Sequence, residues 1–234
     1  CQNAFSNCRK LNVIEFSEDS ELNSIEKNAF YETNLKSLFF TSNVSVLEEG
    51  WCHCTRFLSK ISVSPKNRYI KIIDNKLLFT KSDTKLEVFD KFSFACRDVK
   101  KVTMPSEVKI IEPYSFSDCH KLKTVEFSPD SRLNLIGKSS FHSSEIERIE
   151  IPNRVSQIED DAFIDCFCLK VVPFSPNSQL CLVGDRAFLN TKVKNFTFPK
   201  SVTRIGGCCF FQSLSLESVE ILSTNISIGS GSFS

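Results

Sequence analysis

The sequence has little glycine, with 7 in 234 residues, and almost no net charge, at +1. It therefore lacks the glycine-rich loop that cradles a phosphate group. The balanced charge gives no reason to expect nucleic acid or an anionic membrane surface as a partner. No apolar run approaches the roughly 18–20 residues of a membrane-spanning helix. These absences predict no nucleic-acid binding and no membrane insertion by this chain.

Histidine is equally scarce, which argues against an enzyme. The chain has only His53, His120 and His142, well separated in sequence. A Cys–His hydrolase would need a nucleophile, a base and an orienting group in one cleft. Cys52-His53-Cys54 lacks the second pair of ligands that a zinc site would require. We therefore predict no catalytic residue, no metal site and no cofactor.

Phenylalanine is abundant, with 22 residues, and it recurs periodically. A two-residue step, usually a small residue followed by Phe, occurs ten times along the chain. The gaps between the second residues of successive steps are 25, 22, 42, 22, 25, 22, 25, 22 and 23. Units this short cannot bury their own apolar face, so they stack into a solenoid with the Phe rings in a buried ladder. Nine steps are a small residue followed by Phe, and one is Trp51-Cys52: Ala4-Phe5, Ala29-Phe30, Trp51-Cys52, Ser93-Phe94, Ser115-Phe116, Ser140-Phe141, Ala162-Phe163, Ala187-Phe188, Cys209-Phe210 and Ser232-Phe233.

Each unit also contains an alternating triplet typical of a half-buried strand, such as Val125-Glu126-Phe127. We predict a repeat solenoid, a leucine-rich-repeat-like right-handed superhelix with one parallel β-sheet of about nine short strands. The other side should hold turns, short second strands, or 3-10 or helical turns. The other triplets are Ile14-Glu15-Phe16, Leu38-Phe39-Phe40, Ile61-Ser62-Val63, Val102-Thr103-Met104, Ile149-Glu150-Ile151, Val172-Pro173-Phe174, Phe196-Thr197-Phe198 and Val219-Glu220-Ile221.

Turn chemistry explains the two unit lengths. Long units carry wider turns such as Ser128-Pro129-Asp130-Ser131, and short units carry compact ones such as Pro152-Asn153-Arg154-Val155. The 42-residue gap contains two apolar runs around Asp74-Asn75-Lys76, which predicts a β-hairpin insertion near residues 67–90 that leaves the rod. The insertion either shields the core or makes contacts. We predict one domain, 1–234, which opens and closes inside a repeat and so reads as a segment of a longer protein.

Cysteine is the most chemically suggestive residue, with 11 copies. Cys8, Cys119 and Cys166 each follow a ladder Phe by three residues. A recurring position of this kind predicts a small, buried ladder residue. Because the ladder places many cysteines in different coils, we expect most thiols to be reduced. Disulfides are the alternative if the protein is extracellular.

The pattern of small residue, Phe, two residues, Cys, two residues, Leu resembles the BspA-like leucine-rich repeat family. Ala162-Phe163-Ile164-Asp165-Cys166 with Leu169 matches it, as does the stretch from Phe198 to Gly206. The alternation of long and short turns is similar to members from anaerobic protists. The resemblance implies a cell-surface or extracellular location, adhesion or binding of host or microbial proteins, and no catalytic motif.

The outward side chains of the predicted sheet are the candidate binding surface. Stacked rows make an extended face, and an exposed aromatic beside charged residues favours protein binding over a merely solvated face. Candidate protein-binding residues are Phe39, Ser62, Thr103, Glu126, Arg148, Glu150, Pro173, Thr197 and Glu220. Glycosylation sequons at Asn43, Asn195 and Asn225 give weak support for secretion.

We therefore predict a non-enzymatic protein–protein interaction module. Its partner would be a host extracellular or microbial surface protein. Two alternatives stay open, namely a structural spacer that binds nothing and an intracellular scaffold.

Overall fold

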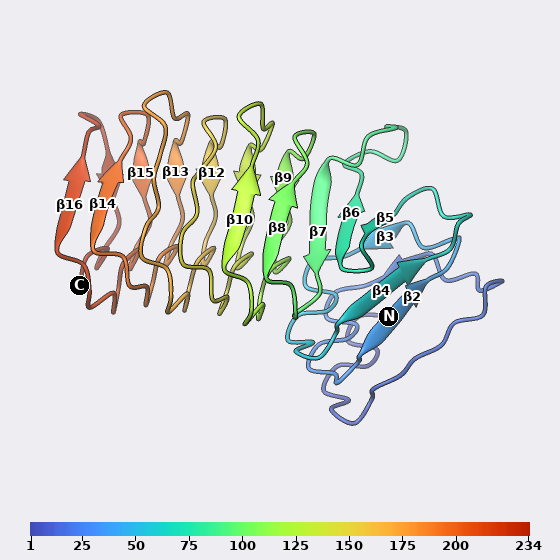
Figure 1. Ribbon diagram of the computed structural model, residues 1–234. Coiled ribbons are helices and arrows are strands. Elements are labelled where there is room, and N and C mark those ends of the chain that lie inside the picture. Colours follow the sequence, from blue (N-terminus) through green and yellow to red (C-terminus); the bar gives the residue numbers. More distant parts are fainter.

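The computed structural model describes residues 1–234 as an all-β solenoid with 17 short strands (Figure 1). None of its segments is a helix long and apolar enough to cross a membrane. Six of the nine predicted triplets form front strands: β2 (Ser37–Phe40), β4 (Lys60–Val63), β8 (Lys101–Met104), β10 (Thr124–Phe127), β14 (Asn195–Phe198) and β16 (Ser218–Ile221). Further along each coil lie back strands: β1 (Ser24–Ile25), β3 (Val46–Leu47), β9 (Ile110–Ile111), β11 (Leu135–Ile136), β12 (Gln157–Ile158), β13 (Leu182–Val183), β15 (Arg204–Ile205) and β17 (Ser227–Ile228).

A column of Phe rings runs through the turns that link each back strand to the next front strand. Ring centroids of Phe116 and Phe141 lie 4.8 Å apart, those of Phe141 and Phe163 4.9 Å, and those of Phe163 and Phe188 5.2 Å, with interplanar angles of 16°, 13° and 4°. The backbone N–H of Phe163 donates to the Ala187 carbonyl of the next coil at 2.8 Å. The predicted solenoid and its Phe ladder are confirmed.

The continuous sheet is made by the back strands, whereas the prediction placed it on the front. Nine strands follow one another in the order β17-β15-β13-β12-β11-β9-β7-β6-β5. The front strands pair only as β2–β4, β8–β10 and β14–β16. Isolated bridges such as Thr124–Arg148 and Arg148–Val171 continue the front row between β10 and β14. The triplet Ile14-Glu15-Phe16 forms no strand.

Proline accounts for one gap in the front row, between residues 149–151 and residues 172–174. The N–H of Ile151 donates to the Pro173 carbonyl at 3.0 Å, as a parallel ladder requires. The reciprocal bond would need an N–H on Pro173, which proline lacks. The triplet pattern counted Pro173 as an ordinary outward residue, so the pattern alone overstated the length of the sheet.

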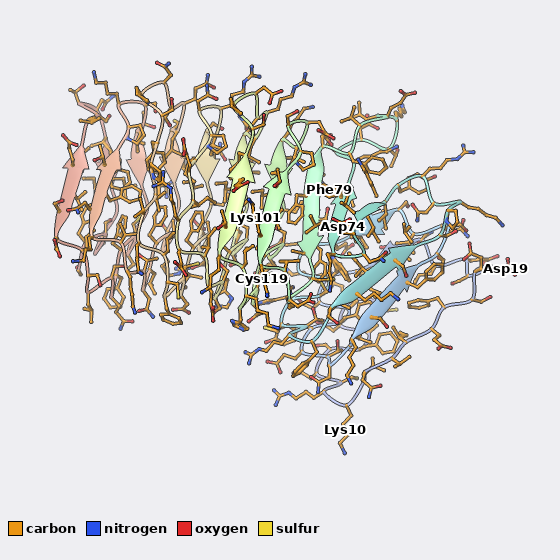
Figure 2. All side chains as sticks on the ribbon, in the orientation of Figure 1. Lys10, Asp19, Asp74, Phe79, Lys101 and Cys119 are labelled. Atoms are coloured by element: carbon orange, nitrogen blue, oxygen red, sulfur yellow. The ribbon has the colours of Figure 1, made fainter.

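The insertion forms a hairpin from β5 (Lys71–Ile73) and β6 (Leu77–Thr80). Asp74 and Asn75 at its tip have φ of 53° and 55°, which suits the two central residues of a type I′ turn. The hairpin does not project from the rod, because β6 pairs antiparallel with β7 (Lys91–Ala95) and extends the back sheet. Phe79, labelled in Figure 2, is buried, and its ring centroid lies 5.3 Å from that of Phe92. Residues 86–89 form no strand.

This insertion shifts the ladder. Phe94 was predicted as a ladder ring, but it lies in β7 and faces Trp51 at 5.4 Å. Phe92 instead stacks on Phe116 at 4.5 Å. In Figure 1 the strands β2 and β4 lie at an angle to β8 and β10. We call residues 1–66 the N-terminal block and residues 91–234 the C-terminal block.

Arg97 fills the bend between the two blocks. Its side chain is buried and its guanidinium donates to the carbonyls of Cys52 at 3.4 Å and Ser115 at 3.5 Å. The guanidinium also lies 4.5 Å from the centroid of the Phe94 ring. One cation thus donates hydrogen bonds to backbone carbonyls from coils on both sides of the bend.

The turns follow the prediction. The N–H of Ser131 donates to the Ser128 carbonyl at 2.9 Å in a long turn, and that of Val155 donates to the Pro152 carbonyl at 3.1 Å in a short one. The three-residue difference between units is therefore confined to the edge where a front strand leads to a back strand. The interior remains one hydrophobic cluster of 51 buried residues.

Candidate protein-binding face

The structure divides the predicted outward row between the two blocks. Phe39 pairs in register with Ser62 on β2 and β4, and Thr103 with Glu126 on β8 and β10. No strand pairing joins β4 to β8, so the row is interrupted at the bend. Of the candidate residues, Phe39, Ser62 and Pro173 are half-buried, and the others are exposed: Thr103, Glu126, Arg148, Glu150, Thr197 and Glu220.

Neighbouring charges on this face are paired with one another. Lys101 Nζ lies 2.7 Å from Glu126 Oε1, and Lys194 Nζ lies 2.9 Å from Glu217 Oε1. The Thr197 hydroxyl donates to Glu220 Oε2 at 3.1 Å. Because these pairs are exposed, each contributes at most about 1 kcal/mol to stability. Their side chains stay available to exchange an internal partner for an external one.

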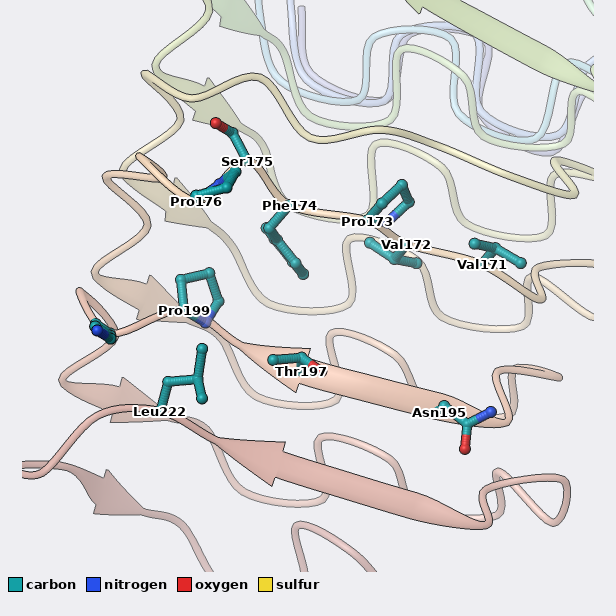
Figure 3. Close-up of a pocket in the computed structure, with 11 residues that line it drawn as sticks. Val171, Val172, Pro173, Phe174, Ser175, Pro176, Asn195, Thr197, Pro199 and Leu222 are labelled. Carbon is teal, nitrogen blue, oxygen red and sulfur yellow. The ribbon is translucent and has the colours of Figure 1, made fainter.

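An apolar groove interrupts this polar face where the front ladder breaks. It has a volume of about 560 Å³ and lies between residues 171–176 and β14 (Figure 3). Val171 and Leu222 at its wall are 44% and 41% exposed. Pro173, Phe174 and Pro199 contribute further apolar surface. Sequence analysis identified Pro173 and Thr197 here but missed Leu222, which lies beyond its triplet.

Lysines flank one end of the groove. Lys170, Lys192 and Lys194 line an adjoining hollow of about 370 Å³ that also includes Val171. Lys194 is paired with Glu217, whereas Lys170 and Lys192 form no ion pair. The apolar groove therefore has a basic rim.

The N-terminal block carries a smaller hollow around Phe39. It has a volume of about 360 Å³, and its lining includes Lys60 and Val13, which is 55% exposed. Phe39 is therefore a wall of this hollow and not the freely exposed anchor that the strand pattern predicted.

All three sequon asparagines are exposed. Asn43 Nδ2 donates to the Ser20 carbonyl at 3.0 Å. Asn195 Oδ1 accepts a hydrogen bond from the Ser218 hydroxyl at 2.6 Å, and Asn195 also lines the apolar groove. Asn225 lies between β16 and β17.

The recurring cysteine position selects a small hydrogen-bond donor. Cys119 and Cys166 are buried, and Cys166 Sγ donates to the Phe141 carbonyl of the previous coil at 3.0 Å. Ser213 takes the same position and donates to the Phe188 carbonyl at 2.9 Å. Burial raises the pKa of the Cys166 thiol to about 12. Cys8 departs from the prediction because it is exposed, and all 11 cysteines are free thiols in the structure.

A polar cluster at the bend joins residues that sequence analysis kept apart. Possible ligand atoms of His53, Cys54 and Asp118 lie within 4.8 Å of one another. The ring centroid of His142 lies 5.9 Å from that of His53, and His120 Nε2 lies 3.9 Å from Asp118 Oδ1. The three histidines, well separated in sequence, therefore surround one corner.

Burial controls the ionisation of the first two members. It lowers the pKa of His53 to about 4 and raises the pKa of Cys54 to about 11. Asp118 is buried and accepts a hydrogen bond from the Ser117 hydroxyl at 3.2 Å, with Arg56 Nε 3.8 Å from its other oxygen. Sequence spacing had shown no partner for Cys52-His53-Cys54, because Asp118 reaches it only across the insertion.

Comparison with known proteins identifies the repeat. A family model described as BspA type leucine-rich repeat region, in 6 copies, matches residues 1–78, 87–213 and 181–234. None of the curated proteins matches the sequence.

Solved structures share the fold. The crystal structure of the pneumococcal vaccine antigen PcpA is similar with a TM-score of 0.81 and 24% identity, over 95% of this chain and 54% of that one. A leucine-rich cell surface protein from Faecalibacterium prausnitzii gives a TM-score of 0.65 and 21% identity, over 94% of this chain and 56% of that one. A leucine-rich repeat protein from Eubacterium ventriosum gives a TM-score of 0.73 and 18% identity, over 96% of this chain and 64% of that one. The chain thus spans about half to two thirds of the length of these structures.

Proposed function

Because the chain belongs to the BspA-type leucine-rich repeat family, we propose that it is a non-enzymatic protein-interaction module whose binding site is the apolar groove of the C-terminal block. The groove is an apolar break in an otherwise polar face. Its partner is a protein segment that fills the groove with an apolar side chain.

The exposed apolar wall carries this proposal. A volume of about 560 Å³ is large enough to accept one or two apolar side chains. Val171, Pro173 and Leu222 would bury apolar surface at about 25 cal/mol per Å² on binding. Such anchors, rather than surrounding polar contacts, dominate the energy of most protein interfaces.

The basic rim favours a partner with acidic residues beside its apolar anchor. Lys170 and Lys192 have no internal carboxylate to displace, so they are available to an external one. Opposite charges at a rim mainly accelerate association and improve specificity. Binding should therefore weaken as ionic strength rises.

A cell-surface location and a host or microbial protein as partner complete the proposal. Two structures with the same fold support it by their descriptions, one as a vaccine antigen and one as a cell surface protein. The rival roles are an intracellular scaffold and a spacer without a partner. Retained free thiols and absent glycans on the native protein would favour the scaffold.

Binding of the purified chain to host cells, extracellular matrix proteins and microbial surfaces tests the groove. Val171→Glu should lower the affinity for the captured partner at least about tenfold, since it places a charge in an apolar site. Val46→Glu is the matched control, because Val46 is 47% exposed but lies on the back strand β3. If the two variants change the affinity equally, or if neither changes it, the groove is not the binding site. If the chain binds none of these surfaces, it acts as a spacer.

Asn195 offers a second test of the same groove. A glycan on this residue would cover the groove that Asn195 lines. If the native protein is glycosylated there, Asn195→Gln should strengthen binding, whereas Asn225→Gln should not. A glycan on Asn195 that leaves binding unchanged would place the site elsewhere.

A further inference from the structure

We propose that His53, Cys54 and Asp118 form a binding site for one Zn²⁺ ion at the bend between the two blocks. Their candidate ligand atoms lie within 4.8 Å of one another. This site is separate from the apolar groove and does not depend on the proposed binding function.

The insertion brings together residues that hold equivalent positions in their coils. Cys54 and Asp118 occupy the same left-handed backbone position of their coils, with φ of 59° and 58°. The coil between them is altered, because β7 joins the back sheet and the N–H of Arg97 donates to the Leu58 carbonyl at 3.0 Å. Two positions normally separated by one more coil therefore become neighbours.

Coil-to-coil packing does not explain the choice of side chains. Elsewhere this position links successive coils by hydrogen bonds, as when Asn190 Nδ2 donates to Asp165 Oδ1 at 2.9 Å. Cys54 makes no such bond to Asp118, and a thiol is a weak donor. Asp118 accepts a hydrogen bond from Ser117 but none from the thiol, whereas a cation between the thiol and the carboxylate would bind both groups.

His53 supplies an independent observation. Its Nε2 atom is buried and has no hydrogen-bond partner. A buried polar atom left unpaired is uncommon in folded proteins and calls for an explanation such as an ion. The ring is held in place by Tyr114, whose centroid is 4.3 Å away, and by Tyr31 at 5.6 Å. The imidazole is thus fixed beside the thiol and the carboxylate.

This ligand set selects the metal. One imidazole, one thiolate and one carboxylate suit Zn²⁺, whereas Ca²⁺ and Mg²⁺ prefer oxygen ligands throughout. Zinc bonds of about 2.0–2.3 Å place tetrahedral ligand atoms about 3.3–3.8 Å apart, so the three side chains must close by about 1 Å. Water takes the fourth position.

Binding is balanced in charge. The Cys54 thiol loses its proton to solvent, and the resulting thiolate and the Asp118 carboxylate neutralise the ion. Arg56 and His120 lie 3.8 and 3.9 Å from Asp118 Oδ1, but their side chains are 64% and 51% exposed and can turn into solvent. The ion would join the coil of Cys54 to that of Asp118 and so fix the angle between the blocks.

Titration of the reduced, metal-free full chain with Zn²⁺ and with Co²⁺ tests this proposal. We expect one equivalent to bind, and the Co²⁺ form to show a thiolate-to-metal absorption band. Cys54→Ser and Asp118→Asn should each weaken Zn²⁺ binding at least about 100-fold while the far-ultraviolet circular dichroism of the metal-free chain stays unchanged.

Cys208→Ser is the matched control, because Cys208 also has a left-handed backbone, with φ of 53°, but lies far along the C-terminal block. It should bind Zn²⁺ as the unmodified chain does. The proposal is overturned by the absence of stoichiometric binding, by a thiolate band that persists in Cys54→Ser, or by an equal loss in Cys208→Ser. If a variant loses its dichroism, Cys54→Ala and His53→Gln replace it.

Discussion

The two blocks use the same repeat but differ in how well their rings align. In the C-terminal block, Phe163 and Phe188 are almost parallel, at 4° and 5.2 Å. In the N-terminal block, Phe5 and Phe30 are parallel at 5.5 Å, but Phe30 meets Trp51 edge-on at 82° and 6.4 Å. The misaligned step from Phe30 lies in a unit of the regular length of 22 residues, in which Cys52 takes the ladder position and Trp51 precedes it. Loss of the ladder Phe, and not an irregular coil length, therefore ends the parallel stack there.

Thiol reactivity should show the largest contrast between the blocks. Cys8 and Cys166 hold the same repeat position, but Cys8 is exposed and Cys166 is fully buried. With a pKa raised to about 12, Cys166 has about 10³-fold less thiolate at neutral pH than a cysteine of pKa near 8.5. Mass spectrometry after brief iodoacetamide treatment should find Cys8 alkylated and Cys166 intact until denaturant is added. Rapid labelling of Cys166 in the folded chain would contradict the buried ladder.

Ring deletion should be more harmful in the C-terminal block. Phe163→Ala removes a ring that is 0% exposed and should cost about 3–5 kcal/mol of unfolding free energy. Phe5→Ala removes a half-buried ring of the first coil and should cost about 1–2 kcal/mol. Urea unfolding followed by circular dichroism measures both. Comparable losses would mean that the two stacks are equivalent.

The bend should depend on Arg97. Arg97→Met removes the guanidinium's hydrogen bonds to the carbonyls of Cys52 and Ser115, to which Thr55 and Ala95 still donate, so the cost should be about 1–2 kcal/mol. Trp51, the single tryptophan, is buried beside Phe94 at the bend and reports on it by fluorescence. In Arg97→Met we expect the unfolding transition seen by Trp51 fluorescence to separate from the one seen by circular dichroism. In the control Arg204→Met, which changes an exposed arginine, the two unfolding transitions should coincide. Coincident transitions in Arg97→Met would show that the blocks are coupled by other contacts.

The smallest effect concerns pH and the loop that closes the insertion. Desolvation raises the pKa of Asp90, but hydrogen bonds from the Ser82 N–H and hydroxyl and from Lys109 outweigh it and hold the pKa below its usual value. A lowered carboxyl pKa stabilises the fold above about pH 4, and this stabilisation is lost as pH falls through the folded-state value.

Asp90→Asn should therefore lower stability at neutral pH by about 1 kcal/mol and flatten its decline below pH 4. Asp74→Asn, at the exposed hairpin tip, is the control and should keep the decline of the unmodified chain. Denaturant midpoints measured between pH 2 and 7 give the comparison. If the stability of Asp90→Asn declines below pH 4 as steeply as that of the unmodified chain, the Asp90 carboxylate is not the cause of the decline.

Local patterns predicted the repeat, the ring column and both turn types, because each depends on residues within one coil or one period. The front sheet was overestimated, since the strand pattern treats Pro173 like any outward residue and ignores its missing N–H. Phe94 was misassigned because the small-residue step recurs by coincidence inside β7.

The bend and its polar cluster could not be predicted in this way. His53 and Asp118 meet only because the insertion changes which coils are neighbours, and no local period encodes that change. The apolar groove also arises from three separate segments. The sequence pattern named Pro173 and Thr197 as outward residues, but the groove they line, with its far wall at Leu222, required the stacked structure.

Hydrogen–deuterium exchange of the full chain tests the two-block solenoid most directly. The N–H groups of Phe116, Phe141, Phe163 and Phe188 each donate to the next coil, so these amides should exchange slowest. Residues 1–24, none of which is buried, should exchange at least about 100-fold faster, and the amides around Trp51 should lie between these limits. Uniform protection across residues 1–234, or rapid exchange at the four Phe amides, would contradict the stacked coils on which this account depends.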